Sequence, residues 1–249
     1  MWKAAVMSGD AAQIEALARD PARVQVKVQG DHQATFATEA AHWAELKKEG
    51  LVSYSPEIDK VQSPQPGLTL ILLNSELKFR EKTRYEQEAI AFVSPRESGP
   101  NLVFVGRERM MFLPPLKELN PKLYDEQADA RREIEESLKA DASDHKRTVL
   151  VFGANWCYDC HVLDAMFHQP DIAPTVTQHF RVVHVDIGRG EKNIDLAQKY
   201  GLNIERGVPA LAVVDANDHV IFADKEGQFE AARSMDPEKV LAYLKQWER

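Results

Sequence analysis

The sequence predicts two different folds in succession, an α+β half followed by an α/β half. In the first half, helical periodicity comes first and long strand patterns follow, whereas in the second half strands and helices alternate. Three prolines, in Pro114-Pro115 and Asn120-Pro121, interrupt the pattern between the halves. Proline removes a backbone donor and disfavours helix in the preceding residue. We therefore expect domains over 1–113 and 122–249, joined by a linker over 114–121.

Composition bounds the classes of function. The chain has 249 residues, and its 44% hydrophobic content is sufficient for two cores. The formal net charge of -8 argues against a nucleic-acid partner. The longest clean apolar run, Leu68–Leu73, is strand-sized, so no membrane span is expected. The compartment stays open: the sequence as it stands indicates the cytoplasm, and a removed signal peptide would indicate the periplasm.

The first half is predicted to place helices before a sheet. Asp10 is a candidate N-cap for an early helix, and a second helix over 36–49 ends at Gly50. A short strand is expected over 23–28. Three long strands with short polar connections are expected over 68–79, 85–93 and 102–112. This order predicts helices packed on an antiparallel meander.

The second half is predicted as a mixed sheet with helices on both faces. Its expected strands lie over 148–152, 182–185, 209–214 and 220–223. Its expected helices run over 124–140, from the turn after 152 to about 167, in a short segment before Phe180, over 194–200, and from Asp236-Pro237 to the end.

Cys157 and Cys160 are the only two cysteines of the chain, and they lie at the turn from a buried strand into a helix. A helix N-terminus favours the thiolate of the first cysteine. This placement predicts dithiol redox chemistry.

Two metal-based alternatives use the same residues. Cys157 to His161 matches a c-type haem attachment string, which needs a haem-wrapping helical domain and an axial partner such as Met166 or Met235. A zinc site would use Cys157, Cys160 and His161, with His168 or a distant residue as the fourth ligand. The strand pattern argues against haem, and the adjacency of Cys160 and His161 is awkward for one tetrahedral ion.

Residues 122–249 resemble the thioredoxin fold, especially the bacterial thioredoxin-like group with a Trp-Cys-x-x-Cys-His string. The resemblance rests on the string from Trp156 to His161, on Gly207-Val208-Pro209-Ala210 and on the final hairpin and helix. It implies that Cys157 is the exposed nucleophile and Cys160 the buried resolving cysteine. It also implies substrate-binding positions, which are Trp156, Tyr158, Val208 and a cis Pro209.

Three departures from the family pattern matter for the chemistry. The family's common buried acid, six residues before the nucleophile, falls on Val151, so a proton shuttle for Cys160 needs another group. Asp159 is expected to oppose thiolate formation, whereas a protonated His161 would favour it. An apparent insertion over 203–205 lengthens the loop beside the expected groove, where Glu205 or Arg206 would tune partner choice.

The first half resembles the cone-shaped fold of nuclear transport factor two and ketosteroid isomerase, in which helices pack on a curved sheet. The resemblance lies in the order of elements and in the opening segment over 2–12. An isomerase-type site needs a carboxylate base and a polarising acid. The chemically suitable side chains are Asp31, Glu39, Glu76, Tyr54 and Tyr85. Solvated or rim side chains are the competing interpretation, and no catalytic residue is assigned there.

These observations predict a thiol–disulfide oxidoreductase that exchanges disulfides with protein or small-molecule substrates, with no metal and no cofactor beyond the Cys157–Cys160 pair. The N-terminal domain is expected to serve in binding or homodimerisation. Two alternatives remain open: a non-catalytic binding protein on a thioredoxin scaffold, and a small-molecule-binding N-terminal domain with the dithiol as redox sensor.

Overall fold

A computed structural model of the chain describes residues 1–94 and 99–248. The chain divides into two compact units, Met1–Leu116 and Lys117–Arg249, called unit 1 and unit 2 below. The division falls within the stretch expected as a linker, 114–121. Within the described residues, every helix is too short or too polar to cross a bilayer.

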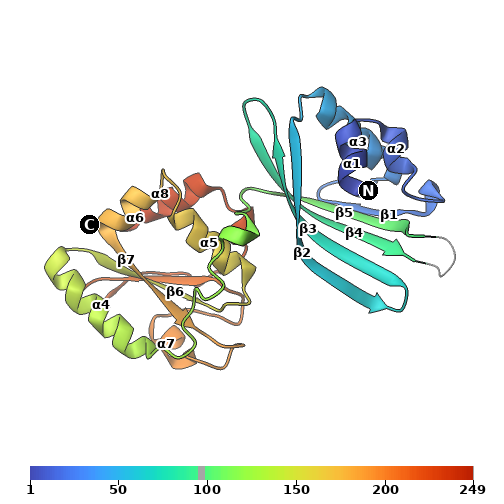
Figure 1. Cartoon of the computed structure of the whole chain (residues 1–249). Helices are drawn as coiled ribbons and strands as arrows, with labels where there is room; N and C mark the ends of the chain where they lie inside the picture. The colour runs from blue at the N-terminus through green and yellow to red at the C-terminus, as the bar shows by residue number, and fades with distance from the viewer. Residues whose placement is uncertain (95–98, 249) are drawn as a thin grey trace. The chain divides into compact units, whose positions relative to one another are not determined.

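Unit 1 places three helices on a five-stranded sheet (Figure 1). The helices are α1 (Trp2–Ser8), α2 (Ala11–Glu15) and α3 (Phe36–Lys48), with the short 3-10 turn η1 (Pro21–Arg23); a second 3-10 turn, η2 (Leu116–Glu118), contains the residues at which the chain passes from unit 1 to unit 2. The strands are β1 (Gln25–Val28), β2 (Ser53–Gln65), β3 (Leu68–Lys78), β4 (Thr83–Val93) and β5 (Asn101–Met110), in the order β1-β5-β4-β3-β2. The predicted α+β class, with helices before a sheet, is confirmed.

The sheet of unit 1 is larger than the sequence indicated. The three predicted long strands are present as β3, β4 and β5, and β2 adds a fourth, unpredicted strand that pairs antiparallel with β3 through two register shifts. This strand lies at the edge, carries Pro56 and Pro64, and is mostly exposed, so it lacks the apolar alternation of a central strand. On the other edge, β1 pairs parallel with β5, so the sheet is antiparallel except at that edge.

The core of unit 1 lies between the helices and one face of the sheet. Trp43 of α3 is fully buried and contacts Trp2 of α1 and Tyr54 of β2 at ring-centroid distances of 6.1 and 5.2 Å. Ile14, Leu46 and Leu102 belong to the same cluster. Asp10 caps α2 by accepting a hydrogen bond from the Ala12 amide at 2.9 Å, as predicted.

Unit 2 is a four-stranded mixed sheet with helices on both faces (Figure 1). Its strands are β6 (Arg147–Gly153), β7 (Phe180–Asp186), β8 (Ala210–Val214) and β9 (Val220–Ala223), in the order β7-β6-β8-β9. Its helices are α4 (Ala130–Asp144), α5 (Tyr158–Phe167), α6 (Ala173–His179), α7 (Ile194–Lys199) and α8 (Pro237–Trp247), with the 3-10 turn η3 (Ala232–Ser234). β6 and β7 are parallel, while β8 is antiparallel to both β6 and β9. The predicted parallel pair with an antiparallel edge is confirmed.

The central strand β6 is buried on both faces. Leu150 and Phe152 pack in a cluster with residues of α4 and α7, and α5, α6 and α8 lie on the opposite side of the sheet (Figure 1). Because β6 ends at Gly153, α5 begins at the carboxyl edge of the sheet, where the two cysteines lie.

The prediction of a helix over 124–140 is wrong at both ends, since α4 covers Ala130–Asp144. Asp129 is the N-cap and accepts a hydrogen bond from the Arg132 amide at 3.2 Å, so the helix begins there. The preceding segment is held elsewhere: Asn155 accepts from the Tyr124 amide and donates to the Tyr124 carbonyl, both at 2.9 Å. These two hydrogen bonds hold Tyr124 next to the cysteine turn.

Candidate functional site

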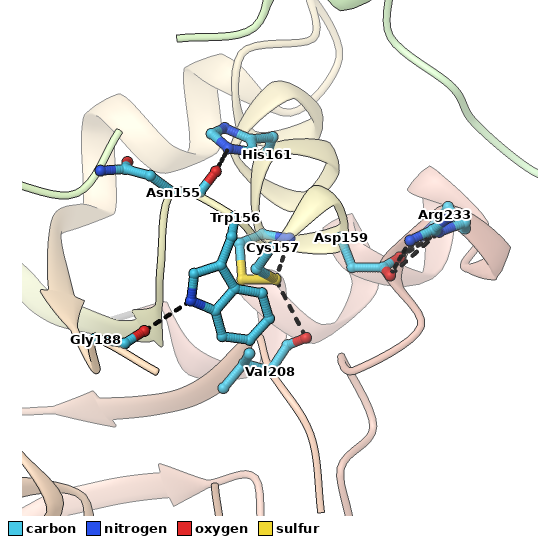
Figure 2. Close-up of a disulfide and its surroundings, with 9 residues drawn as sticks. Asn155, Trp156, Cys157, Asp159, His161, Gly188, Val208 and Arg233 are labelled. Atoms are coloured by element: carbon cyan, nitrogen blue, oxygen red, sulfur yellow. Dashed lines mark hydrogen bonds and ion pairs between the residues drawn. A yellow bond between two sulfur atoms is a disulfide. The ribbon is translucent and has the colours of Figure 1, made fainter. Parts of the chain in front are cut away.

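The candidate site is built around a disulfide between Cys157 and Cys160 at the start of α5 (Figure 2). Their Cα atoms are 5.3 Å apart, and both residues are buried, with 5% exposure for Cys157 and none for Cys160. Cys157 is the N-cap of α5, and its Sγ accepts a hydrogen bond from the Cys160 amide at 3.1 Å. In the reduced form the same amide and the helix N-terminus would stabilise a thiolate on Cys157.

The segment before β8 closes one side of the disulfide. The Val208–Pro209 peptide bond is cis, and the Val208 carbonyl oxygen lies 3.4 Å from Cys157 Sγ (Figure 2). A disulfide carries no proton, so in the oxidised form the sulfur and the carbonyl oxygen are in contact without a hydrogen bond. In the reduced form the Cys157 thiol could donate a hydrogen bond to this carbonyl. The structure therefore brings the predicted Val208 and Pro209 beside the predicted nucleophile.

Trp156 and Tyr158 flank the first cysteine. Trp156 is 57% exposed, and its indole Nε1 donates to the Gly188 carbonyl at 2.7 Å, which fixes an apolar ring at the surface beside Cys157 (Figure 2). Tyr158 is half-buried, with the Arg233 guanidinium 4.8 Å from its ring centroid. Arg206 of the lengthened loop lies 3.3 Å from Glu226 in an exposed ion pair.

The carboxylate of Asp159, which was expected to oppose thiolate formation, is paired with a positive charge in the structure. Arg233 contacts both carboxylate oxygens, with Nη2 2.6 Å from Oδ2 and Nε 3.0 Å from Oδ1. The Arg233 backbone amide donates to Oδ1 as well, at 2.9 Å. The sequence could not reveal this pairing, because the two residues are 74 positions apart.

His161 is buried, and one of its ring nitrogens bonds to the backbone of the cysteine turn. Its Nε2 lies 2.9 Å from the Asn155 carbonyl oxygen (Figure 2). A carbonyl only accepts, so Nε2 carries the proton of this bond. This hydrogen bond links α5 to the backbone of the turn that precedes Cys157.

Tyr124 and Gly153 belong to the site, and sequence reasoning did not single them out. Tyr124 packs in one cluster with Cys157 and Cys160, and Val208 borders that cluster. A Cβ on Gly153 would lie 2.4 Å from the Tyr124 hydroxyl and 2.5 Å from Cys160 Sγ, so only glycine fits there. A glycine that ends an otherwise apolar strand was the available signal.

Among the described residues, histidine, cysteine, aspartate and glutamate side chains form no group of three or more that could hold a metal ion. His168, the suggested fourth zinc ligand, instead lies with its Nδ1 2.8 Å from the Asp164 carbonyl on the exposed side of α5.

Two of the five candidate side chains of unit 1 lie in a buried polar cluster, and three lie outside it. The Tyr54 hydroxyl donates to Glu88 Oε1 at 2.7 Å, and Glu39 accepts from Arg107 Nε at 2.9 Å. Outside the cluster, Asp31 is exposed, Glu76 pairs with Lys78 at 3.0 Å, and Tyr85 packs on Phe112 with ring centroids 5.8 Å apart.

Burial dominates the electrostatics of the cluster. Glu88 is 1% exposed and also accepts from the Trp2 indole at 2.9 Å; burial raises its pKa. Burial likewise raises the pKa of Glu86 to about 7, against the attraction of Arg107, and the negative charges of Glu88 and Glu39 add to the rise. Large side chains, including Trp2, Trp43 and Tyr54, fill the surrounding core.

Residues 129–216 match a family model described as thioredoxin-like. Among solved structures, a disulphide isomerase from Xylella fastidiosa Temecula1 is 37% identical, covers 50% of this chain and 95% of that chain, and has a TM-score of 0.48.

Other solved structures are similar to the N-terminal half. An NTF-2-like protein of unknown function from Shewanella oneidensis MR-1 is 11% identical, with 42% of this chain and 88% of that chain covered and a TM-score of 0.36. A ketosteroid isomerase-like protein from Erwinia carotovora atroseptica SCRI1043 is 13% identical, with 45% and 88% covered and a TM-score of 0.35. No curated protein matches the chain.

Proposed function

We propose that this chain, whose C-terminal unit belongs to the thioredoxin-like family, is a thiol–disulfide oxidoreductase that acts on disulfides of proteins or small thiols. The observation that carries the proposal is the asymmetry of the disulfide. Cys157 caps a helix beside a backbone carbonyl and an exposed tryptophan and keeps 5% exposure, whereas Cys160 has none. This arrangement suits one sulfur to meet a substrate and the other to complete the exchange.

The reduced form would react in two displacements. The Cys157 thiolate attacks a substrate disulfide R–S–S–R′, a new sulfur–sulfur bond forms, and R′–S⁻ leaves and takes a proton from solvent. The Cys160 thiol then attacks Cys157 Sγ, its proton passes to the leaving R–S⁻, and the Cys157–Cys160 disulfide forms. The substrate is reduced by two electrons and the protein is oxidised by two; the reverse sequence would oxidise a substrate dithiol.

The surroundings of Cys157 support recognition of an extended substrate. Trp156 presents an exposed ring on one side of Cys157. Tyr158, on the same turn as Trp156, packs against the Arg233 guanidinium of η3. The Val208 carbonyl faces the sulfur, so a substrate backbone could pair with this segment as an added strand.

Insulin reduction with dithiothreitol as electron donor tests the proposal. We expect the wild type to accelerate precipitation of the insulin B chain, Cys157→Ser to abolish the effect, and Cys160→Ser to accumulate mixed disulfides. A folded wild-type protein without turnover would favour the non-catalytic binding alternative, and activity retained in Cys157→Ser would overturn the mechanism.

Unit 1 is proposed to bind a partner or a second copy for the redox unit. An open pocket of about 600 Å³ along β1, β4 and β5, bordered by Val26, Phe104 and Arg107, supports a binding role. Light scattering of the full chain tests the homodimer, with a monomer mass at micromolar concentration as the result that excludes it.

A further inference from the structure

Cys160 lacks the acid that the family commonly places near the resolving sulfur. That position is Val151 here, an apolar side chain with 2% exposure on β6. The resolving step nevertheless requires negative charge to develop on a sulfur with no solvent exposure. A buried charge without a hydrogen-bond donor is costly, so another group should supply the donor.

The Tyr124 hydroxyl is the polar group placed to do this. An ideal Cβ built on Gly153 would lie 2.4 Å from the Tyr124 hydroxyl oxygen and 2.5 Å from Cys160 Sγ. The hydroxyl oxygen and the sulfur are therefore separated by no more than the sum of these two distances. Tyr124 is 1% exposed, and among the described residues its hydroxyl has no hydrogen-bond partner. A buried hydroxyl without a partner is unusual in a protein interior and calls for a reason.

The tyrosine is fixed by contacts that do not use its hydroxyl. Its backbone amide and carbonyl are both bonded to the Asn155 side chain at 2.9 Å. Its ring packs edge-on against His184 of β7, with centroids 5.3 Å apart. The hydroxyl is therefore positioned by its surroundings, and removing it would leave the ring in place.

The charges around this hydroxyl keep it protonated. Burial raises the pKa of Tyr124, and the negative charges of Asp164 and Asp186 add to the rise. Asp164 of α5 lies 3.3 Å from His184 Nε2, and Asp186 at the end of β7 pairs with Lys192 at 2.9 Å. On the other side of the disulfide, Asp159 is paired with Arg233. A phenol in this setting donates its proton in a hydrogen bond and does not act as a base.

We propose that Tyr124 is a positioning residue whose hydroxyl donates a hydrogen bond to the Cys160 thiolate in the reduced protein. The inference builds on the proposed function, for which it supplies the missing stabilisation of the resolving sulfur. In the disulfide Cys160 carries no charge, which accounts for a hydroxyl without a partner in the oxidised form. The Tyr124 proton remains on its oxygen throughout, and the proton that Cys160 releases as its thiolate develops is balanced by the proton that the departing substrate thiolate takes up.

The test measures the titration of Cys160 directly, without reference to turnover. In a Cys157→Ser background, the ¹³Cβ chemical shift of Cys160 is followed against pH with and without Tyr124→Phe. Loss of a hydrogen bond to a charged sulfur should raise the Cys160 pKa by about one unit, a roughly tenfold loss of thiolate at fixed pH. Tyr243→Phe, which removes a phenol hydroxyl from α8, is the matched control and should leave the midpoint unchanged.

A second replacement tests the opposite direction. Fluorotyrosine at position 124 is a stronger donor of the same shape, so the Cys160 midpoint should fall. An unchanged midpoint in both Tyr124→Phe and the fluorotyrosine protein would overturn the inference. Insulin reduction by the wild type is assayed separately: a shifted Cys160 titration in a protein without turnover would defeat the proposed function and leave the role of Tyr124 standing.

Discussion

The buried carboxyl group of Glu86 should make unit 1 less stable as pH rises. Its side chain is 4% exposed, and Arg107 Nη1 approaches Oε1 only to 3.4 Å because the guanidinium is engaged closely by Glu39. Among the described residues, Oε2 has no hydrogen-bond partner. The folded state therefore holds a carboxyl group whose charged form is poorly solvated, and the uncharged form is favoured.

The sign and size of the effect follow from proton linkage. Burial raises the pKa of Glu86 from 4.5 to about 7, so between these values the folded state binds more protons than the unfolded state. The free energy of unfolding then falls as pH rises through this window, and the loss is complete above the folded-state pKa. For one such group, raising the pH from about 5.5 to about 8 should cost about 2 kcal/mol.

Glu86→Gln tests this reasoning, since an amide has the same shape and no charge. Urea unfolding of the full chain at the two pH values, with pulse proteolysis and mass spectrometry of peptides from β4, reports the stability of unit 1. The variant should lose less stability than the wild type on going to the higher pH, by about 2 kcal/mol. Glu81→Gln, which changes an exposed carboxylate of the same unit, is the control. Equal pH dependence in Glu86→Gln and the wild type would refute the argument.

Three further changes test other parts of the structure. Arg233→Ala should raise the pKa of the reduced Cys157 thiol, because it leaves the negative charge of Asp159 unpaired, and adding Asp159→Asn should reverse the rise. An unchanged pH profile of Cys157 alkylation in Arg233→Ala would contradict this. Gly153→Ala should lower the free energy of unfolding of unit 2 by about 1–3 kcal/mol, because the added methyl group would overlap the Tyr124 hydroxyl and Cys160 Sγ. A variant as stable in urea as the wild type would show that the space beside Gly153 can accommodate a methyl group. Asp129→Ala should cost about 1 kcal/mol by removing the cap of α4, whereas Asp129→Asn should cost less; equal losses in both would argue against capping.

The elements of unit 2 were predicted well because short stretches of its sequence determine its central strand and its helix caps. β6 is an uninterrupted apolar run, as expected for a strand buried on both faces, and the cysteine pair follows it directly. The cap of α8 at Asp236, with proline at the first helical position, was equally readable. β6 and β7 form the expected parallel pair, and β8 and β9 form the expected terminal hairpin.

The errors lie where burial is one-sided or where tertiary contacts override propensity. β2 was missed because an edge strand with prolines and charges has little apolar alternation, although it pairs with β3 over most of its length. The predicted helix included residues 124–129, yet Asn155 bonds both backbone groups of Tyr124 and Asp129 caps the helix that begins at Ala130. In each case a partner that is distant in sequence settled the local structure.

The electrostatics of the cysteine pair depend most strongly on such distant partners. The string from Trp156 to His161 predicts an acidic residue beside the nucleophile, and by itself this would weaken the thiolate. Arg233, 74 positions later, is paired with that carboxylate, and Tyr124, 31 positions before its anchor Asn155, places a hydroxyl near Cys160. The two sulfurs come from one turn, but the charged and polar side chains placed near them come from two other segments. A peptide of the cysteine turn alone should therefore titrate differently from the folded protein at both sulfurs.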